Sequence, residues 1–110
     1  MSGGARLAAG LWVSAYLHRL GLEMVPAYVL ARGDATAGAV LVKIATLDGR
    51  ARLMARRSGP EGRAWMETAE GPEAEIDASV ARQRKVDPDL WVIEVEARDG
   101  DARLDAPGLE

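Results

Sequence analysis

The sequence predicts an α+β fold in which two helices pack on one face of an antiparallel sheet, giving a two-layer domain. Apolar residues at three- and four-residue spacing mark a first helix from about Leu7 to Leu20. Alternating apolar runs then meet at Asp48-Gly49, a pair of residues typical of a tight β-hairpin. A second helical pattern covers about residues 72 to 85 and leads into another apolar run, Leu90 to Val95. The expected order is therefore helix, four-stranded meander, helix and fifth strand.

The size and composition of the chain fit a globular protein. At 110 residues it is close to the commonest domain size, so we expect residues 1–110 to form a single domain with loose ends at 1–4 and about 105–110. Cysteine is absent, which excludes disulfides and thiolate metal sites and fits a reducing cytoplasm. No apolar run approaches the roughly 20 residues that cross a bilayer, and the N-terminal stretch is too interrupted for an export signal. We therefore expect a cytoplasmic protein that does not engage membranes.

One apolar stripe defines the first helix. It consists of Ala9, Val13, Tyr16, Leu17 and Leu20. Ser14, Ala15 and His18 fall on the opposite side, so the single histidine of the chain is expected at the surface. Gly21 directly follows the stripe and is expected to end the helix in a left-handed conformation.

Turn residues divide the next part of the chain into four strands. Pro26 separates the helix from the first of them, because proline restricts the residue before it to extended geometry. The strands are expected at residues 27–32, 39–47, 50–58 and 63 to about 68. Because short turns join consecutive antiparallel strands, the four should run as a meander.

The turns also predict which side chains share a face of the sheet. A two-residue turn at Asp48-Gly49 places Ile44 opposite Leu53, and the next turn places Arg56 opposite Trp65. The predicted apolar face comprises Tyr28, Leu30, Val40, Val42, Ile44, Leu53, Ala55, Ala64 and Met66. The predicted mixed face comprises Leu41, Lys43, Ala45, Arg50, Arg52, Met54, Arg56, Trp65 and Glu67. Both helices are expected on the apolar face.

Charged residues mark both ends of the second helix. Pro72 is expected at its first position, and acids follow in the first turn and basic residues in the last, as the helix dipole favours. Asp87-Pro88 ends it. The fifth strand, Leu90 to Val95, is apolar on both faces at its start. The sequence does not indicate which strand it pairs with. Asp99-Gly100 would then turn the chain into a short sixth strand.

Four segments of the chain resemble a known family. They are GLWVSAYLHRL at residues 10–20, ARGDATAGAVLVK at 31–43, LDGRARL at 47–53 and DPDLWVIEVE at 87–96. Together they are similar to a family of short, uncharacterised alphaproteobacterial proteins that form a domain of unknown function. The resemblance implies a compact, cytoplasmic bacterial protein, and it supplies no catalytic residue to transfer.

Residues that would carry catalysis are few. A lone His18 excludes a cluster of histidine ligands, and we expect no metal site and no cofactor. Helix, three strands, helix and strand is also the core order of restriction-endonuclease-like nucleases, to which this chain would add a fourth strand. These nucleases carry an Asp on one strand, and then an acid and a Lys two positions apart on the next, to hold Mg²⁺ and polarise the attacking water. Asp34 and Lys43 would take the first and last of these places, but Leu41 stands where the second carboxylate is needed. A degenerate nuclease-like enzyme is therefore one alternative, and we favour a non-enzymatic protein.

The mixed face is the expected binding surface. Lys43, Arg52, Arg56 and Trp65 should share it, with Arg56 opposite Trp65 for a cation–π contact. The leading hypothesis is a protein-interaction module that uses this face, with a second copy of the chain or another protein as its partner. Nucleic-acid binding on the same face is the other alternative, which the net charge of −3 does not favour.

Overall fold

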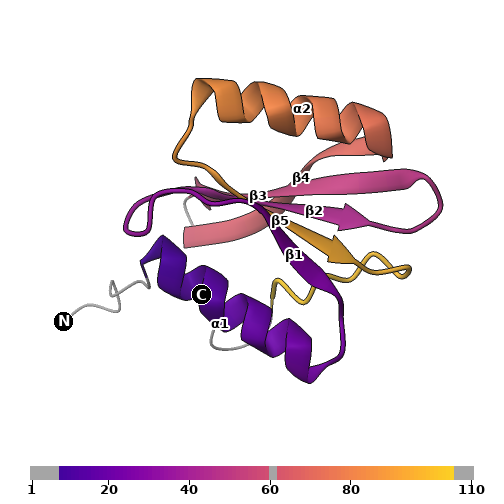
Figure 1. The fold of residues 1–110 in the computed structure, drawn as a ribbon, viewed down its shortest axis with the longest axis horizontal. Helices are drawn as coiled ribbons and strands as arrows, with labels where there is room; N and C mark the ends of the chain where they lie inside the picture. The colour runs from indigo at the N-terminus through magenta and orange to yellow at the C-terminus, as the bar shows by residue number, and fades with distance from the viewer. Residues whose placement is uncertain (1–7, 60–61, 106–110) are drawn as a thin grey trace.

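The structure is a computed structural model that describes residues 8–59 and 62–105 (Figure 1). Its elements are α1 (Ala9–Leu22), β1 (Ala27–Ala31), β2 (Val40–Ala45), β3 (Arg50–Gly59), β4 (Gly62–Pro72), α2 (Glu73–Val86) and β5 (Trp91–Glu96). This confirms the α+β class and the predicted order of helices and strands. The expected loose ends, apart from Asp105, lie outside the described residues.

The two helices cover opposite faces of one five-stranded sheet (Figure 1). The core on the α1 side includes Trp12, Val13, Tyr16 and Leu20 of the helix and Val42, Ile44, Ile93 and Val95 of the sheet. The core on the α2 side consists of Leu41, Ala51, Leu53, Ile76 and Leu90. The prediction of two layers, with both helices on one face, is therefore wrong. Strands β2 and β5 bury side chains on both faces, which requires a helix on each side.

The sheet is mixed, with strand order β1-β5-β2-β3-β4. Strand β5 pairs antiparallel with β1 and parallel with β2, so it separates two strands that were predicted to be neighbours. The meander is thus correct for β2, β3 and β4 and wrong for β1. The physical reason lies in β5 itself, because a strand that is apolar on both faces belongs in the interior of a sheet.

The turn between β2 and β3 is one residue longer than predicted. The Thr46 N–H donates to the Arg50 carbonyl at 3.3 Å, and Leu47 and Gly49 both adopt positive φ, at 63° and 87°. Lys43 consequently lies opposite Leu53, where the sequence predicted Ile44. A one-residue shift moves every side chain of a strand to the other face, so the two predicted faces of β2 and β3 are wrong relative to each other.

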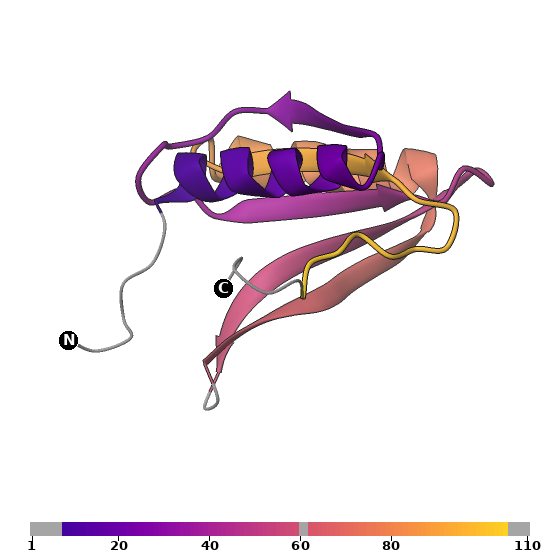
Figure 2. The same ribbon diagram turned by 90° about the horizontal axis from the view of Figure 1, so that it is seen from below.

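The register between β3 and β4 is confirmed, with Arg56 opposite Trp65 and Ala55 opposite Met66. Strand β4 continues to Pro72, past the predicted end near Thr68, and its pairing with β3 resumes beyond a register shift between Leu53 and Met54. Strands β3 and β4 are longer than the other strands. They project beyond α1 as a twisted hairpin (Figure 2).

The end of α1, the start of α2 and the segment after β5 differ from the prediction. Helix α1 continues through Gly21 to Leu22, and Met24, with φ 58°, takes the left-handed conformation predicted for Gly21. Pro72 is the residue before α2 and lies outside its first turn. Residues 97–105 turn at Gly100 but form no strand, so the sixth strand is not present in the described chain. This segment instead returns to α1, where the Tyr16 hydroxyl donates to the Ala102 carbonyl at 2.7 Å.

Candidate functional site

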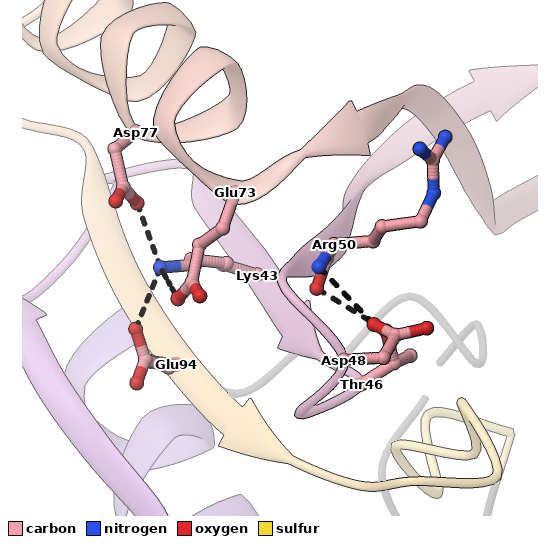
Figure 3. A network of polar contacts seen from close by, with 7 residues as sticks. All are labelled: Lys43, Thr46, Asp48, Arg50, Glu73, Asp77 and Glu94. Carbon is pink, nitrogen blue, oxygen red and sulfur yellow. Dashed lines mark hydrogen bonds and ion pairs between the residues drawn. The ribbon is translucent and has the colours of Figure 1, made fainter.

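Lys43 is a buried cation surrounded by carboxylates (Figure 3). Its Nζ lies 2.7 Å from Glu73 Oε2, 2.7 Å from Asp77 Oδ1 and 2.9 Å from Glu94 Oε1. Glu73 and Asp77 are one turn apart on α2, and Glu94 stands beside Lys43 in the parallel pairing of β2 with β5. The cluster therefore ties α2 to the two central strands of the sheet.

The ammonium group of Lys43 is held in its charged form. Burial by itself lowers the pKa of a lysine, but hydrogen bonds to Asp77, Glu73 and Glu94 outweigh this effect and raise the pKa of Lys43. A lysine that acts as a base or nucleophile needs the opposite, a lowered pKa. Lys43 is 2% exposed as a residue, so it cannot form part of a surface for a partner. We interpret the cluster as structural.

The other three predicted binding residues do come together. Arg52, Arg56 and Trp65 lie on the α1 side of the β3–β4 hairpin, the opposite side of the sheet from Lys43. The Arg56 guanidinium carbon lies 5.8 Å from the Trp65 ring centroid, the cation–π contact expected from the sequence, and 5.6 Å from that of Trp12. The two tryptophan rings are themselves 5.4 Å apart.

This face is closed over part of its area. Trp65 packs against the core beneath α1, and its buried indole N–H has no hydrogen-bond acceptor among the described residues. Arg52 pairs with Glu67 at 3.5 Å and also lies against Gly100, where an added Cβ would approach Arg52 Nη1 to 3.0 Å. In the structure, much of the predicted binding surface is therefore an internal contact between the β3–β4 hairpin, α1 and the segment after β5.

The nuclease-like pair is not assembled in the structure. The Asp34 carboxylate accepts hydrogen bonds from the backbone N–H groups of Thr36 and Ala37, within its own loop. Lys43 is engaged by its three carboxylates and has no access to solvent for polarising a water. No group of metal-binding side chains suited to an ion occurs in residues 8–59 and 62–105. His18 is exposed on α1, as predicted.

A groove of about 490 Å³ with apolar and polar lining lies beside α2 and is hereafter called the α2 groove. Leu41, Ala55 and Leu90 belong to the core on this side or pack against it and provide an apolar base. One wall is the second half of α2, with Ser79, Arg82, Gln83 and Val86. The volume lies within the range of about 300–1,000 Å³ that is usual for ligand pockets.

The α2 groove combines apolar surface with polar groups. Val86 is 87% exposed at its wall, an unusual position for a large apolar side chain. Arg82 is exposed and forms no ion pair within the described part of the chain, whereas Gln83 and Ser79 bond to each other at 3.3 Å. Sequence reasoning missed this site because the corrected register is needed to place Leu41 and Ala55 under α2. The available signal was the thin apolar stripe of the second helix, Ile76, Val80 and Val86, of which the structure buries Ile76 and leaves Val86 exposed.

The fold and these sites define a small α+β protein with a mixed sheet between two helices. The family model described as "Protein of unknown function (DUF1491)" matches residues 7–105. The chain therefore belongs to the DUF1491 family, in agreement with the resemblance seen in its sequence blocks. No curated protein matches the chain.

Solved structures of this family share the fold. A crystal structure of a DUF1491 family protein from Caulobacter crescentus is 40% identical, covers 87% of this chain and 92% of its own, and has a TM-score of 0.79. An NMR structure of a DUF1491 family protein from the same organism is also 40% identical, with coverages of 90% and 93% and a TM-score of 0.77. A solution structure from A. tumefaciens is 30% identical over 84% and 87% of the two chains, with a TM-score of 0.72.

Neither α1 nor α2 is long and apolar enough to cross a membrane.

Proposed function

We propose that this protein is a non-enzymatic, cytoplasmic protein-interaction module whose α2 groove binds an extended segment carrying apolar and acidic side chains. The observation that carries the proposal is the open apolar base beside Arg82. Apolar side chains of the segment would cover Leu41, Ala55 and Val86, and a carboxylate would pair with the guanidinium of Arg82. The absence of cysteine supports the cytoplasmic location.

The groove is suited to this role because its wall is fixed. The Lys43 cluster anchors the first half of α2, and Arg84 Nη1 donates to the carbonyls of Arg32, Pro88 and Leu90 at the other end of the helix. A rigid groove loses little conformational freedom when a segment binds, which favours affinity. A small open groove of this kind suits a weak, transient complex.

A peptide titration tests the proposal. The probe is an eight-residue peptide in which glutamate alternates with leucine, and the control peptide has glutamine at each glutamate. We expect saturable changes in the backbone amide NMR signals of groove residues, such as Leu41 and Ala55, with the acidic peptide. Arg82→Gln should weaken binding about tenfold, the effect of one charge-assisted hydrogen bond of roughly 1.5 kcal/mol. Lys85→Gln removes the same charge from a part of α2 that does not line the groove and should have little effect.

Three results would contradict the proposal. The absence of any saturable change would show that the groove does not bind the acidic peptide, and equal binding of the glutamine peptide would show that Arg82 does not recognise its carboxylates. Changes confined to Arg52 and Trp65, which do not line the groove, would move the site to the predicted face of the hairpin. In that case single-stranded nucleic acid is the next probe, because its affinity should fall steeply with salt, and less steeply in Arg52→Ala.

A further inference from the structure

Strand β1 lies at one edge of the sheet and has an open backbone on its outer side. Among the described residues it pairs only with β5, and Figure 2 shows no described element beyond it on the other side. The Glu96 N–H donates to the Pro26 carbonyl at 2.9 Å, so Pro26 faces β5. Because residues of an antiparallel strand alternate between its two edges, Tyr28 also faces β5. The N–H and carbonyl groups of Ala27 and Val29 therefore point to the open edge.

The side chains along this edge are apolar and exposed. Tyr28 is 48% exposed, Val29 37% and Leu30 50%, and no charged residue occurs from Met24 to Ala31. The other edge strand, β4, carries several charged residues, as edge strands that stay unpaired usually do. Strand β1 thus combines unused backbone hydrogen-bonding groups with an uncharged surface, which favours the addition of a further strand.

We propose that β1 pairs antiparallel with β1 of a second copy and joins the two sheets into one. A two-fold axis beside Tyr28 sets Val29 opposite the partner's Ala27, and each N–H of this pair donates to the other carbonyl. The axis repeats the same pair on its other side. Tyr28 then stands opposite the partner's Tyr28 at a position without hydrogen bonds, where side chains of neighbouring strands approach most closely.

Strand β1 is suited to be its own partner. It is the one strand of the described chain that contains no charged residue, so the pairing brings no charge into contact with this apolar edge. Pro26 lacks an N–H, but it faces β5 and withholds no donor from the new pairing. The register shift between Val29 and Ala31 limits the pairing to a short stretch of β1.

The expected dimer is weak. One pair of short strands buries well below the roughly 1,600 Å² of total surface that is usual in stable complexes. We therefore expect dissociation in the micromolar to millimolar range, which sedimentation equilibrium can follow at protein concentrations from about 10 μM to about 1 mM. The apparent mass of the natural chain should rise with concentration from 11.7 kDa toward twice that value.

A cysteine cross-link tests the pairing, because the natural chain contains no cysteine. In the proposed dimer the two Cα atoms at position 28 lie about 4.5 Å apart, within the range of a disulfide. The two Cα atoms at position 30 lie roughly 13 Å apart, since Leu30 stands opposite the partner's Pro26. With oxidised glutathione, Tyr28→Cys should form a disulfide-linked dimer at least about tenfold faster than the similarly exposed Leu30→Cys. Non-reducing gel electrophoresis measures both rates.

Two substitutions at Val29 test the open edge without a new cysteine. Val29→Pro removes an N–H that β5 does not use, and Val29→Lys places a charge on the edge, so each should abolish the rise in mass. Val86→Lys, in the α2 groove, should leave self-association unchanged, so that this proposal and the proposed function fail independently. Circular dichroism confirms that each variant is folded, and Val29→Lys decides the test if Val29→Pro is not.

Three results would overturn the proposal. The first is a constant mass of 11.7 kDa up to the highest protein concentration. The second is a rise in mass that survives the substitutions at Val29, which would place self-association on another surface. The third is an equal rate of cross-linking for Tyr28→Cys and Leu30→Cys, which would mean random collision or a different register.

Discussion

Lys43 compensates the charge of three carboxylates at the boundary between α2 and the sheet. Without Lys43 these carboxylates would lose their shared cation. Lys43→Met should lower the free energy of unfolding by about 3 kcal/mol, because removing one partner of a buried ion pair leaves uncompensated charge. Urea denaturation followed by tryptophan fluorescence measures the change. Lys85→Met is the matched control, since Lys85 is exposed and forms no part of the cluster, and it should shift stability by no more than about 0.5 kcal/mol. Equal effects of the two substitutions would contradict a structural role for the cluster.

The raised pKa of Lys43 gives this contribution a definite pH dependence. The folded chain holds the lysine proton more tightly than the unfolded chain does, so the stabilisation is complete below the unfolded pKa of about 10.4 and is lost as the pH rises through the folded pKa. The stability difference between the natural chain and Lys43→Met should therefore be constant from neutral pH to about pH 9 and should shrink above about pH 10.4. A difference that already declines near pH 8 would show that Lys43 is not held as an ammonium.

One residue accounts for the main error in the predicted site. Leu47 adopts a left-handed conformation, which is rare for a leucine, and so the turn at Asp48-Gly49 has one more residue than its sequence indicates. The resulting shift separates Lys43 from Arg52. The pairing of Arg56 with Trp65 depended only on the next turn and was predicted correctly. Local sequence decides which residues form a turn, whereas the exact length of the turn depends on the packing of both strands.

At the scale of elements, the loop before β2 depends on close approach to β5. An added Cβ at Gly33 would collide with the Asp89 carbonyl and lie 2.6 Å from Trp91 Cδ1. Gly33→Ala should therefore cost about 2 kcal/mol or more, since this loop also supplies the Asp34 carbonyl that accepts from Trp91 Nε1. Gly71→Ala meets no atom within 4 Å and should change stability by less than about 1 kcal/mol. Thermal unfolding compares the two variants, and similar melting temperatures would contradict the close packing of this loop.

Arg84 joins the end of α2 to the loops beside β1 and β5. Arg84 Nη1 donates to three carbonyls, those of Arg32, Pro88 and Leu90, at 3.1, 2.6 and 2.8 Å. Arg84→Met should destabilise the protein by about 2 kcal/mol and increase hydrogen exchange in the last turn of α2, because these acceptors lose their donor. Arg82→Met, two residues away and exposed, should leave both unchanged. Unaltered exchange in Arg84→Met would show that the helix end is held by other contacts.

The identities of α1, β2, β3 and β5 could be read from periodicity, because each of these elements buries a regular set of apolar residues. The neighbours of β5 could not. The run LWVIEV indicates a strand buried on both faces, but two open positions in the sheet satisfy that pattern equally well until the helices are placed. Tertiary packing against α1 and α2 decides the position, and this choice in turn puts the two helices on opposite sides.

At the scale of the whole molecule, β5 holds the sheet together. It is the only strand that pairs with β1 in the described chain, and it also pairs with β2 along its full length. A chain that ends at residue 88 should therefore lose the cooperative unfolding transition of the natural protein. Adding a synthetic peptide of residues 89–105 should restore part of the native circular dichroism, because the peptide contains β5, the strand that pairs with both β1 and β2. Native-like stability of the shortened chain would contradict the central role of β5.

The position of β5 also has a consequence for synthesis in the cell. The ribosome produces β1, β2, β3 and β4 before β5, so the nascent chain carries two strands whose shared partner does not yet exist. The β2–β3–β4 meander and both helices can form early, but α1 has no complete surface to pack on until β5 has left the exit tunnel. Folding of this domain should therefore be completed only after β5 has been synthesised. Until that moment the apolar edges of β1 and β2 are exposed, and they are the part of the nascent chain that a chaperone would need to protect.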